Sequence, residues 1–502
     1  MVVGGPLARA RDDGRLTGLV AGVAVAVALG WAAATLPVAS VALLLAASVA
    51  GLATLLRPEW VFLLLPFAVP FGELRALNVG GVEVGGVELL IAAVAGAWLL
   101  RGMARRDVRL PRAPLLAPLL VFVGALLLSL LSATSMPAAF KEVAKWLEVV
   151  AVYVLGLAFA DEAGAKRGRY VAALTVAVIL AGTLEALAGI AQSALRAGPP
   201  SYAILGGRLW RAFGQFGQPN PFGGFMNLTL MPVLSGLVGL ALLGWRGAGR
   251  VSALLTPLLL VSGAILGLGL ALSWSRGAWL GAVVGGAVVV LGWLTLTLAR
   301  PAPDAADATR RRAVGALWVI ALVGLLLALA GATDLTPAGV AGRFGSVGEY
   351  LGGFDVTNIQ VTDDNFAVVE RVAHWYAAAG MWADHFWTGV GAGNYAAAYP
   401  DYRVPRWTDP LGHAHNYYLN IGAEAGFIGL LAYLALALAA LVHQARVAAR
   451  RTDWARRALA LGVLGALVAT AAHNVFDNLY VHSMGAYVAI LLCLVDAADA
   501  GP

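Results

Sequence analysis

Apolar runs long enough to cross a lipid bilayer recur from end to end of this 502-residue chain, and no other feature constrains its fold as strongly. A helix needs about 20 mostly apolar residues to span the hydrocarbon core of a membrane. Charged residues make up 12% of the chain, which is about half of their share in ordinary soluble domains. We therefore predict an all-α polytopic membrane protein.

The predicted spans number about 14, each bounded by charge, proline or glycine. They are residues 16–36, 38–56, 60–71, 87–100, 115–131, 143–160, 170–195, 225–245, 254–272, 278–298, 314–330, 417–442, 458–472 and 481–495. The runs 60–71 and 87–100 are short for a full crossing, so they are either complete spans or broken, re-entrant segments. The first run is long and a second follows almost at once, so we expect an uncleaved anchor rather than a signal peptide.

The basic residues set the orientation of these spans. With a cytoplasmic N-terminus, every inner loop from residue 101 onward is a basic cluster, as the positive-inside rule requires. Dropping only one of the two short spans would place those clusters outside, so the total is about 14 or about 12 and both termini are cytoplasmic. The basic residues left on the outer face indicate an anionic partner there. They are Arg75, Lys141, Lys145, Arg196, Arg208, Arg211, Arg276, Arg343, Arg371, Arg403 and Arg406.

The chain divides into three parts. Residues 1–330 hold spans and two outer segments with arginines, 196–224 and 273–279; residues 331–416 form a long outer loop; residues 417–502 hold the last spans. Within the loop, the glycine-rich stretch 339–353 is suited to a flap. Apolar residues at helical spacing predict a helix over 370–386 that lies on the membrane or covers a cavity, and the glycines of 389–393 read as turn residues.

Arg276 is the sharpest single signal for a site, because an arginine in a short turn between two spans is costly unless it is paired or hydrated. The alternative is an arginine that snorkels to the interface. Together with Arg211 it would form a guanidinium pair suited to a phosphate or diphosphate. Lys145 and Arg208 are weaker candidates for the same pocket, and each reads equally well as an interfacial anchor.

His415 is the natural proton acceptor, since an unperturbed histidine side chain titrates near neutrality and a hydroxyl nucleophile needs a base of that kind. The alternative is a structural histidine bonded to a backbone carbonyl. His413, two positions earlier, points elsewhere on a helix and is a weaker candidate. We expect Asn416 and Glu424 to brace the start of the following helix or to orient the histidine.

The remaining histidines, acidic residues and single cysteine do not define a second site. The histidines show no fixed metal-binding spacing, and Asp363 with Asp364 is either a divalent-ion ligand pair or a helix cap. His473, His482, Asn474 and Asp477 flank the last outer loop and are expected to be structural. The single cysteine, Cys493, reads as a small core residue. The net charge of +6 resides in short loops between apolar runs, so it does not indicate nucleic-acid binding.

Taken in order, these motifs resemble the O-antigen ligase and O-antigen polymerase (Wzy-type) integral-membrane glycosyltransferases. The resemblance covers the C-terminal 60% of the chain, while the first 190 residues match only as generic spans. The motifs are RAFGQFGQPN from Arg211 to Asn220, SRGAW around Arg276, GVGAGNY from Gly389, HAHNYYL around His415, and EAGFIG from Glu424.

The resemblance implies a metal-independent, inverting glycosyl transfer without a cofactor, in a GT-C-like helical fold with its active site facing the periplasm. The donor would be a glycan on undecaprenyl diphosphate. The acceptor would be a lipid A–core sugar in a ligase of lipopolysaccharide biosynthesis, or another lipid-linked repeat in a polymerase. Arg211 and Arg276 would hold the diphosphate and His415 would deprotonate the acceptor. The chain has about two more predicted spans than a twelve-span ligase, which weakens the choice of ligase over polymerase.

Three other readings compete. A protein O-oligosaccharyltransferase would use the same donor. A transporter or flippase of lipid-linked sugars would show internal repeats and charges near mid-membrane, which this sequence lacks. A cell-shape peptidoglycan polymerase would depend on an acidic outer-loop residue, for which Asp363 and Asp364 are the obvious candidates.

Overall fold

A computed structural model describes residues 37–72, 77–79, 82–204, 206–243, 249–298, 359–361 and 366–500, together with a few isolated positions between 305 and 320. The predicted spans 16–36 and, for most of its length, 314–330 lie outside the described residues. So do the predicted flap at 339–353 and the pair Asp363 and Asp364.

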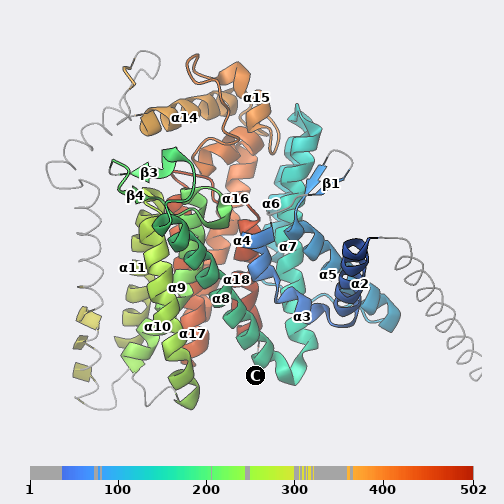
Figure 1. The fold of residues 1–502 in the computed structure, drawn as a ribbon, viewed down its shortest axis with the longest axis vertical. Coiled ribbons are helices and arrows are strands. Elements are labelled where there is room, and N and C mark those ends of the chain that lie inside the picture. Colours follow the sequence, from blue (N-terminus) through green and yellow to red (C-terminus); the bar gives the residue numbers. More distant parts are fainter. Residues whose placement is uncertain are drawn as a thin grey trace, which may run out of the picture.

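The described part is a bundle of long helices with a smaller helical layer across one end (Figure 1). The bundle helices are α2 (Val38–Leu56), α3 (Pro58–Phe62), α4 (Leu65–Phe71), α5 (Gly86–Arg105), α6 (Leu116–Ser129), α7 (Met136–Glu162), α8 (Arg167–Ala194), α9 (Pro219–Leu243), α10 (Gly249–Leu272), α11 (Arg276–Leu298), α16 (Tyr417–Arg450), α17 (Trp454–His473) and α18 (Met484–Asp499). Eight helices in the described ranges are long and apolar enough to cross a membrane. The prediction of an all-α polytopic membrane protein is confirmed.

The two short predicted spans differ in structure. Residues 60–71 are split between α3 and α4, with Pro70 inside the second helix, whereas 87–100 lies within the 20-residue helix α5. The short strands β1 (Leu77–Val79) and β2 (Val82–Val84) pair between them. The first short span is therefore a broken segment and the second is a candidate span.

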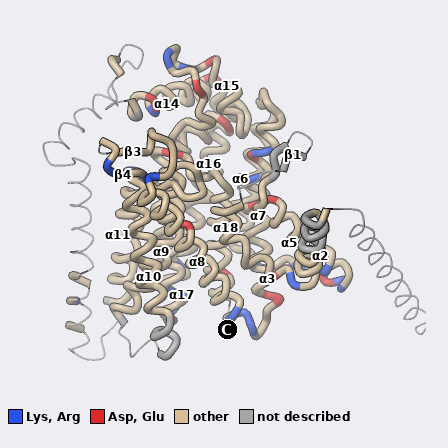
Figure 2. The backbone as a smooth tube through the Cα atoms, in the orientation of Figure 1, with Lys and Arg blue, Asp and Glu red and all other residues tan. Residues whose placement is uncertain are grey.

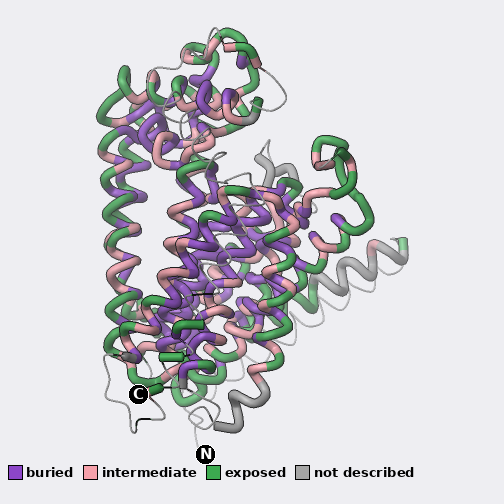
Figure 3. The backbone as a smooth tube through the Cα atoms, turned by 90° about the vertical axis from the view of Figure 1, so that its left-hand side faces the viewer, coloured by how far each residue is buried: buried purple, intermediate pink, exposed green. Residues whose placement is uncertain are grey.

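Helix α18 lies at the centre of the bundle and is buried along nearly its whole length, as Figure 3 shows for the middle of the molecule. It packs against α7 and α17, and α17 packs in turn against α9 and α11. Charged positions gather toward the two ends of the bundle (Figure 2), which is the distribution that a bilayer imposes on spanning helices.

Glycines bring α11 and α17 into close contact. A Cβ on Gly281 would lie 2.6 Å from the carbonyl oxygen of Ala469, and one on Gly285 would lie 2.4 Å from that of Gly465. One on Gly277 would clash with the ring of His473. Small residues at helix interfaces permit such backbone approach inside membranes, and here they place the start of α11 beside the end of α17.

The outer layer comprises α14 (Phe366–Asp384) and α15 (Tyr395–Tyr402). The predicted helix over 370–386 is thus present as α14, shifted toward the N-terminus by a few residues. Its buried face includes Val369, Ala373, Ala377 and Met381, whereas Tyr376 is exposed. The layer is joined to α16 by backbone hydrogen bonds: Val390 N–H donates to Ala423 O over 2.8 Å and Gly391 N–H donates to Glu424 O over 2.9 Å. Gly389, Gly391 and Gly393 have positive φ, so these glycines are turn residues as predicted.

Candidate active site

His415 occupies a strained turn just before α16. Its φ is +50°, a conformation that non-glycine residues rarely adopt and that often marks functional sites. Its backbone N–H donates to His413 Nδ1 over 3.1 Å, and its carbonyl accepts from Trp375 Nε1 over 3.3 Å. Asn416 caps α16, since its Oδ1 accepts from the N–H groups of Tyr418 and Leu419. These contacts fix where the imidazole of His415 points.

Asp477 faces both histidines from the loop between α17 and α18. Its Oδ1 lies 3.4 Å from His415 Nδ1 and 3.9 Å from His413 Nε2. The loop is tied to the start of α16, because Tyr417 N–H donates to Asn474 O over 2.8 Å. Burial raises the pKa of Asp477, but the hydrogen bond and charges of the surrounding histidines outweigh it and hold that pKa below the usual range. Asp477 is therefore ionised at neutral pH.

The ring nitrogens of His413 and His415 differ in their hydrogen-bond partners. Because His413 Nδ1 accepts the N–H of His415, its proton resides on Nε2, toward Asp477. Burial lowers the pKa of His413 to about 4, so this ring is neutral at pH 7. Within the described residues, neither ring nitrogen of His415 has a partner with full hydrogen-bond geometry. With Nδ1 directed at Asp477, Nε2 is left to accept a proton.

Arg211 lies in the loop between α8 and α9. Within this loop, the short strands β3 (Ala203–Ile204) and β4 (Leu209–Trp210) pair just before Arg211. Its Nε donates to Ser273 O over 2.9 Å and its guanidinium donates to Asn220 Oδ1 over 3.2 Å. Burial lowers the pKa of Arg211 to about 10, so it remains a cation at neutral pH.

Arg276 is the first residue of α11, in the predicted turn between two spans. Ser275 Oγ accepts from Ala278 N–H over 3.4 Å at this helix start, so Arg276 stands where the helix dipole also favours an anion. The charge of Arg276 lowers the pKa of Arg211, and that of Asp477 raises it. These three groups thus lie within electrostatic reach of one another at one end of the bundle.

Two of the remaining predicted site residues contact Arg211 or His415, and the other three have partners or positions elsewhere. Asn220 and His413 contact Arg211 and His415 directly. Lys145 pairs with Glu142 Oε2 at 2.6 Å and donates to Tyr480 O, while Arg208 is exposed at the turn between β3 and β4. Glu424 is buried within α16, where it accepts the N–H of Tyr395 over 3.1 Å and so braces the glycine-rich turn.

Helix α14 contributes residues that the sequence does not assign to the site. The ring of His374 lies 5.8 Å from that of His415, centroid to centroid, and burial lowers the pKa of His374 to about 4. The charge of Glu370 interacts with His415, and that of Arg371 with Arg211. In the sequence, only the basic charge of Arg371 on the predicted outer face indicates that α14 belongs to the site. No motif with a fixed residue spacing connects α14 with His415.

His413, His415 and Asp477 are also the one group in the described ranges whose ligand atoms, all within 4.8 Å, are arranged so that they could hold a metal ion. The grouping is also explained without an ion, because the carboxylate of Asp477 faces both imidazole rings.

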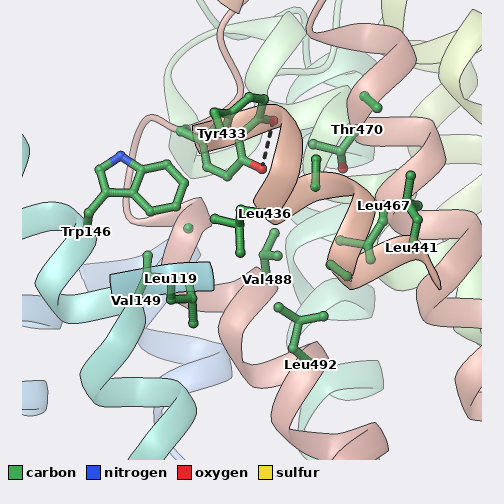
Figure 4. A pocket seen from close by; sticks show the side chains of 15 residues that line it. Leu119, Trp146, Val149, Tyr433, Leu436, Leu441, Leu467, Thr470, Val488 and Leu492 are labelled. Carbon is green, nitrogen blue, oxygen red and sulfur yellow. Dashed lines mark hydrogen bonds between the residues drawn. The ribbon is translucent and has the colours of Figure 1, made fainter. Parts of the chain in front are cut away.

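A small apolar pocket lies within the bundle between α6, α7, α16, α17 and α18 (Figure 4). Tyr433 and Tyr480 share a hydrogen bond of 3.3 Å at its upper rim, and Thr470 is one of few polar groups in the wall. The deeper wall is formed by aliphatic side chains such as Leu436, Val488 and Leu492. The pocket has the lining that a hydrocarbon chain requires.

Residues 261–434 match the family model described as O-antigen ligase, a segment that contains Arg276, α14 and His415. No curated protein matches the chain. Over these residues, the match bears out the resemblance that the sequence motifs predict, and it supports a glycosyltransferase-like membrane enzyme that acts on lipid-linked glycans.

Proposed function

We propose that the protein transfers a glycan from undecaprenyl diphosphate to a sugar hydroxyl at the outer face of the cytoplasmic membrane, with a lipid A–core sugar as the acceptor. The observation that carries the proposal is the meeting of a histidine–carboxylate pair with Arg211 and Arg276 at one end of an apolar bundle. Such a transfer needs one group that removes a proton and others that stabilise a departing diphosphate.

The oxygen of the acceptor hydroxyl attacks the anomeric carbon of the donor glycan, and His415 Nε2 accepts the proton that this hydroxyl loses. Asp477 holds the Nδ1 proton of the same ring and stabilises the imidazolium that forms, as the buried aspartate does in Ser-His-Asp enzymes. The 3.4 Å separation is long for a hydrogen bond, and catalytic contacts of this kind commonly shorten when substrate binds.

Arg211 and Arg276 bind the diphosphate on the opposite side of the anomeric carbon. Both are placed before substrate arrives: Arg211 by Ser273 and Asn220, and Arg276 by its position at the start of α11. Arg211 is half-buried and Arg276 is exposed. Cations held in position in advance stabilise a leaving group with little reorganisation at the moment of reaction. The small apolar pocket below Tyr433 and Tyr480 would contact only a short part of the prenyl chain, and the rest of the chain would lie in the bilayer.

The test is glycan transfer by the full chain in liposomes that contain undecaprenyl-diphosphate-linked repeat units, with and without a lipid A–core acceptor. Transfer to the core that falls at least about a hundredfold in His415→Ala and in Arg276→Gln supports the proposal. Arg406→Gln, an exposed cation of the outer layer, is the matched control and should transfer at the wild-type rate.

Two results would change the assignment. Extension of the lipid-linked glycan without use of the core would make the protein a polymerase with the same site. Full activity in both variants would rule out the site, and absence of transfer to any acceptor would favour a transporter.

A further inference from the structure

Three exposed aromatic rings lie together where the outer layer meets the bundle. Trp387 is 62% exposed, Phe386 is 45% exposed and Phe427 is 37% exposed. The rings of Phe386 and Phe427 stack with their centroids 5.4 Å apart, and the ring of Trp387 meets both of them edge to face. These three residues form the aromatic patch. Exposed apolar clusters commonly mark a surface that contacts a partner or a membrane.

The aromatic patch is a fixed part of the fold. Phe427 N–H donates to Phe386 O over 2.7 Å, and Ile428 N–H donates to Trp387 O over 3.3 Å. A Cβ on Gly426 would clash with the carbonyl group of Trp387, so glycine permits this close approach of the two backbones. The chain on both sides of the patch is thus joined by hydrogen bonds, which hold the three rings in one arrangement.

The height of the patch along α16 matches one boundary of a bilayer. Helix α16 is a candidate membrane span, and its backbone is helical from Phe427 to its end. From Phe427 to the exposed Arg446 the helix rises about 28 Å, and the hydrocarbon core of a bilayer is about 30 Å thick. Tryptophan rings are enriched at membrane–water interfaces. The patch and Arg446 therefore lie about one hydrocarbon thickness apart.

The aromatic patch is continuous with an exposed apolar row on the same span. Residues three and four positions apart share one face of a helix, and the residues that continue this face beyond Phe427 are exposed leucines. They are Leu431, Leu434 and Leu438.

The neighbouring helix α6 extends this apolar surface, and polar residues border it. Helix α6 packs against α16, and Leu131, just after α6, is 84% exposed. The next residue, Ser132, donates to Thr388 Oγ1 over 3.4 Å, which places this end of α6 beside the patch. On the other side, Asp384 and His385 are exposed and polar. The surface thus changes from apolar to polar at the patch.

We propose that the aromatic patch contacts a lipid surface, at the water–lipid boundary of the leaflet next to the outer layer. Its position at the end of the leucine row of α16, one hydrocarbon thickness from Arg446, favours lipid over a second protein as the occupant. A tryptophan suits this boundary, because its ring is apolar and its N–H group can bond to lipid headgroups.

Helix α14 connects this lipid contact with the candidate site. Trp375 donates to His415 O, and Phe386 lies two residues beyond the end of α14 at Asp384. From Trp375 to Asp384 the helix rises about 14 Å. The contact between the patch and lipid therefore sets the height of His415 relative to the membrane.

The test measures the depth of the patch with the full chain in lipid nanodiscs. Trp387→Cys is labelled with bimane, and Cys493 is buried, so the label reports on position 387. The quenchers are nitroxides on the upper or the lower part of the lipid acyl chain, and iodide in the water. The upper nitroxide should quench at least about twofold more than the lower one, because interfacial groups lie about 5–10 Å deep, and iodide should quench little.

Two further positions calibrate the depth. A label on Leu434→Cys, which lies about 10 Å further along α16 than Phe427, should be quenched more by the lower nitroxide than by the upper one. A label on Arg406→Cys, at an exposed position in the same layer as α14, should be quenched by iodide and by neither nitroxide.

Three outcomes would overturn the inference. Strong quenching at position 387 by iodide would place the patch in water. Quenching there by none of the three agents would show that protein covers it, from a second copy of this chain or from another molecule. Equal quenching by lipid at positions 387 and 406 would mean that the patch has no special depth. If Trp387→Cys does not fold, Phe427→Cys decides and should report the same depth.

Discussion

Two histidine–aspartate pairs lie at opposite ends of the bundle and are built differently. At the end covered by α14 and α15, His415 Nδ1 lies 3.4 Å from Asp477, and both ring nitrogens of His415 lack a partner with full hydrogen-bond geometry in the described structure. At the other end, His443 Nε2 contacts Asp496 at 2.5 Å, and Tyr153 Oη also donates to this carboxylate. Both aspartates are buried, so burial does not explain the difference.

The charges around the two pairs differ as well. Beyond Asp496, Arg451 pairs with Asp499, Arg167 pairs with Asp161, and Arg457 donates to backbone carbonyls. At the end with Asp477, the charges of Arg276 and Arg371 both act on Arg211. The end with satisfied partners holds helices together, whereas the end with unused hydrogen-bonding capacity on His415 is suited to a substrate.

The largest effect should come from Asp477→Asn. Without a carboxylate to hold the Nδ1 proton, His415 loses the tautomer that leaves Nε2 as the base, and the transfer rate should fall about a thousandfold or more. The measurement is single-turnover transfer in liposomes. Asp496→Asn, the corresponding change at the other end, should keep the rate of the folded protein close to wild type. Similar losses in both variants would break the contrast between the pairs.

Asp496→Asn should instead lower stability. It removes the charge that faces His443 and the acceptor of Tyr153, and breaking a buried charged pair costs about 3–5 kcal/mol. Thermal unfolding in detergent checks this. The control is Asp107→Asn, since Asp107 pairs with Arg109 at an exposed site and exposed pairs contribute little. Equal melting temperatures for Asp496→Asn and wild type would contradict a structural role.

Acid should act on the outer layer. Burial lowers the pKa of His374 from 6.5 to about 4, so the unfolded chain takes up a proton at higher pH than the folded one. The contribution of a neutral His374 to stability is present above about pH 6.5 and is lost as the pH falls toward 4, by about 3 kcal/mol. His374→Gln should flatten the dependence of unfolding on pH, while His385→Gln, at an exposed position, should not. Identical profiles would mean that His374 does not remain neutral.

The smallest effect should come from Asn220→Ala. Its loss removes the hydrogen bond to the guanidinium of Arg211, and a hydrogen bond to a charged group contributes about 1.5 kcal/mol, so kcat/KM for the donor should fall about tenfold. Gln218→Ala, at an exposed position in the same segment, is the control. An unchanged kcat/KM would show that Ser273 alone is enough to hold Arg211.

The sequence predicts the features that depend on local composition. Long apolar runs predict most of the described helices, since hydropathy over a window of this length decides which segments enter a bilayer. The turn at Arg276 and the helix over 370–386 are predicted for the same reason. In each case the pattern that indicates the structure lies within one short stretch of sequence. The broken segment at 60–71 is indicated by its two prolines.

The partners of His415 are not predictable in this way. Asp477 is 62 positions away from it, in a loop that reads as structural, and the two meet only because Tyr417 bonds to Asn474 at the end of α17. The charge of Arg371 acts on Arg211 because α14 packs on α16, which no periodicity reveals. Contacts between elements depend on packing geometry, and a single sequence carries no direct record of it.

The hydrogen bonds between the glycine-rich turn and α16 have a consequence for protein engineering. At Gly426 the helical backbone is interrupted, and Phe427 N–H donates to Phe386 O over 2.7 Å, so α16 and the chain before it form one interlocked unit. A chimera that exchanges only the outer loop with a relative would cut through these bonds. The smallest segment that can be exchanged as a whole therefore reaches from α14 to beyond Gly426, and acceptor preference should be inherited together with the first turns of a membrane helix.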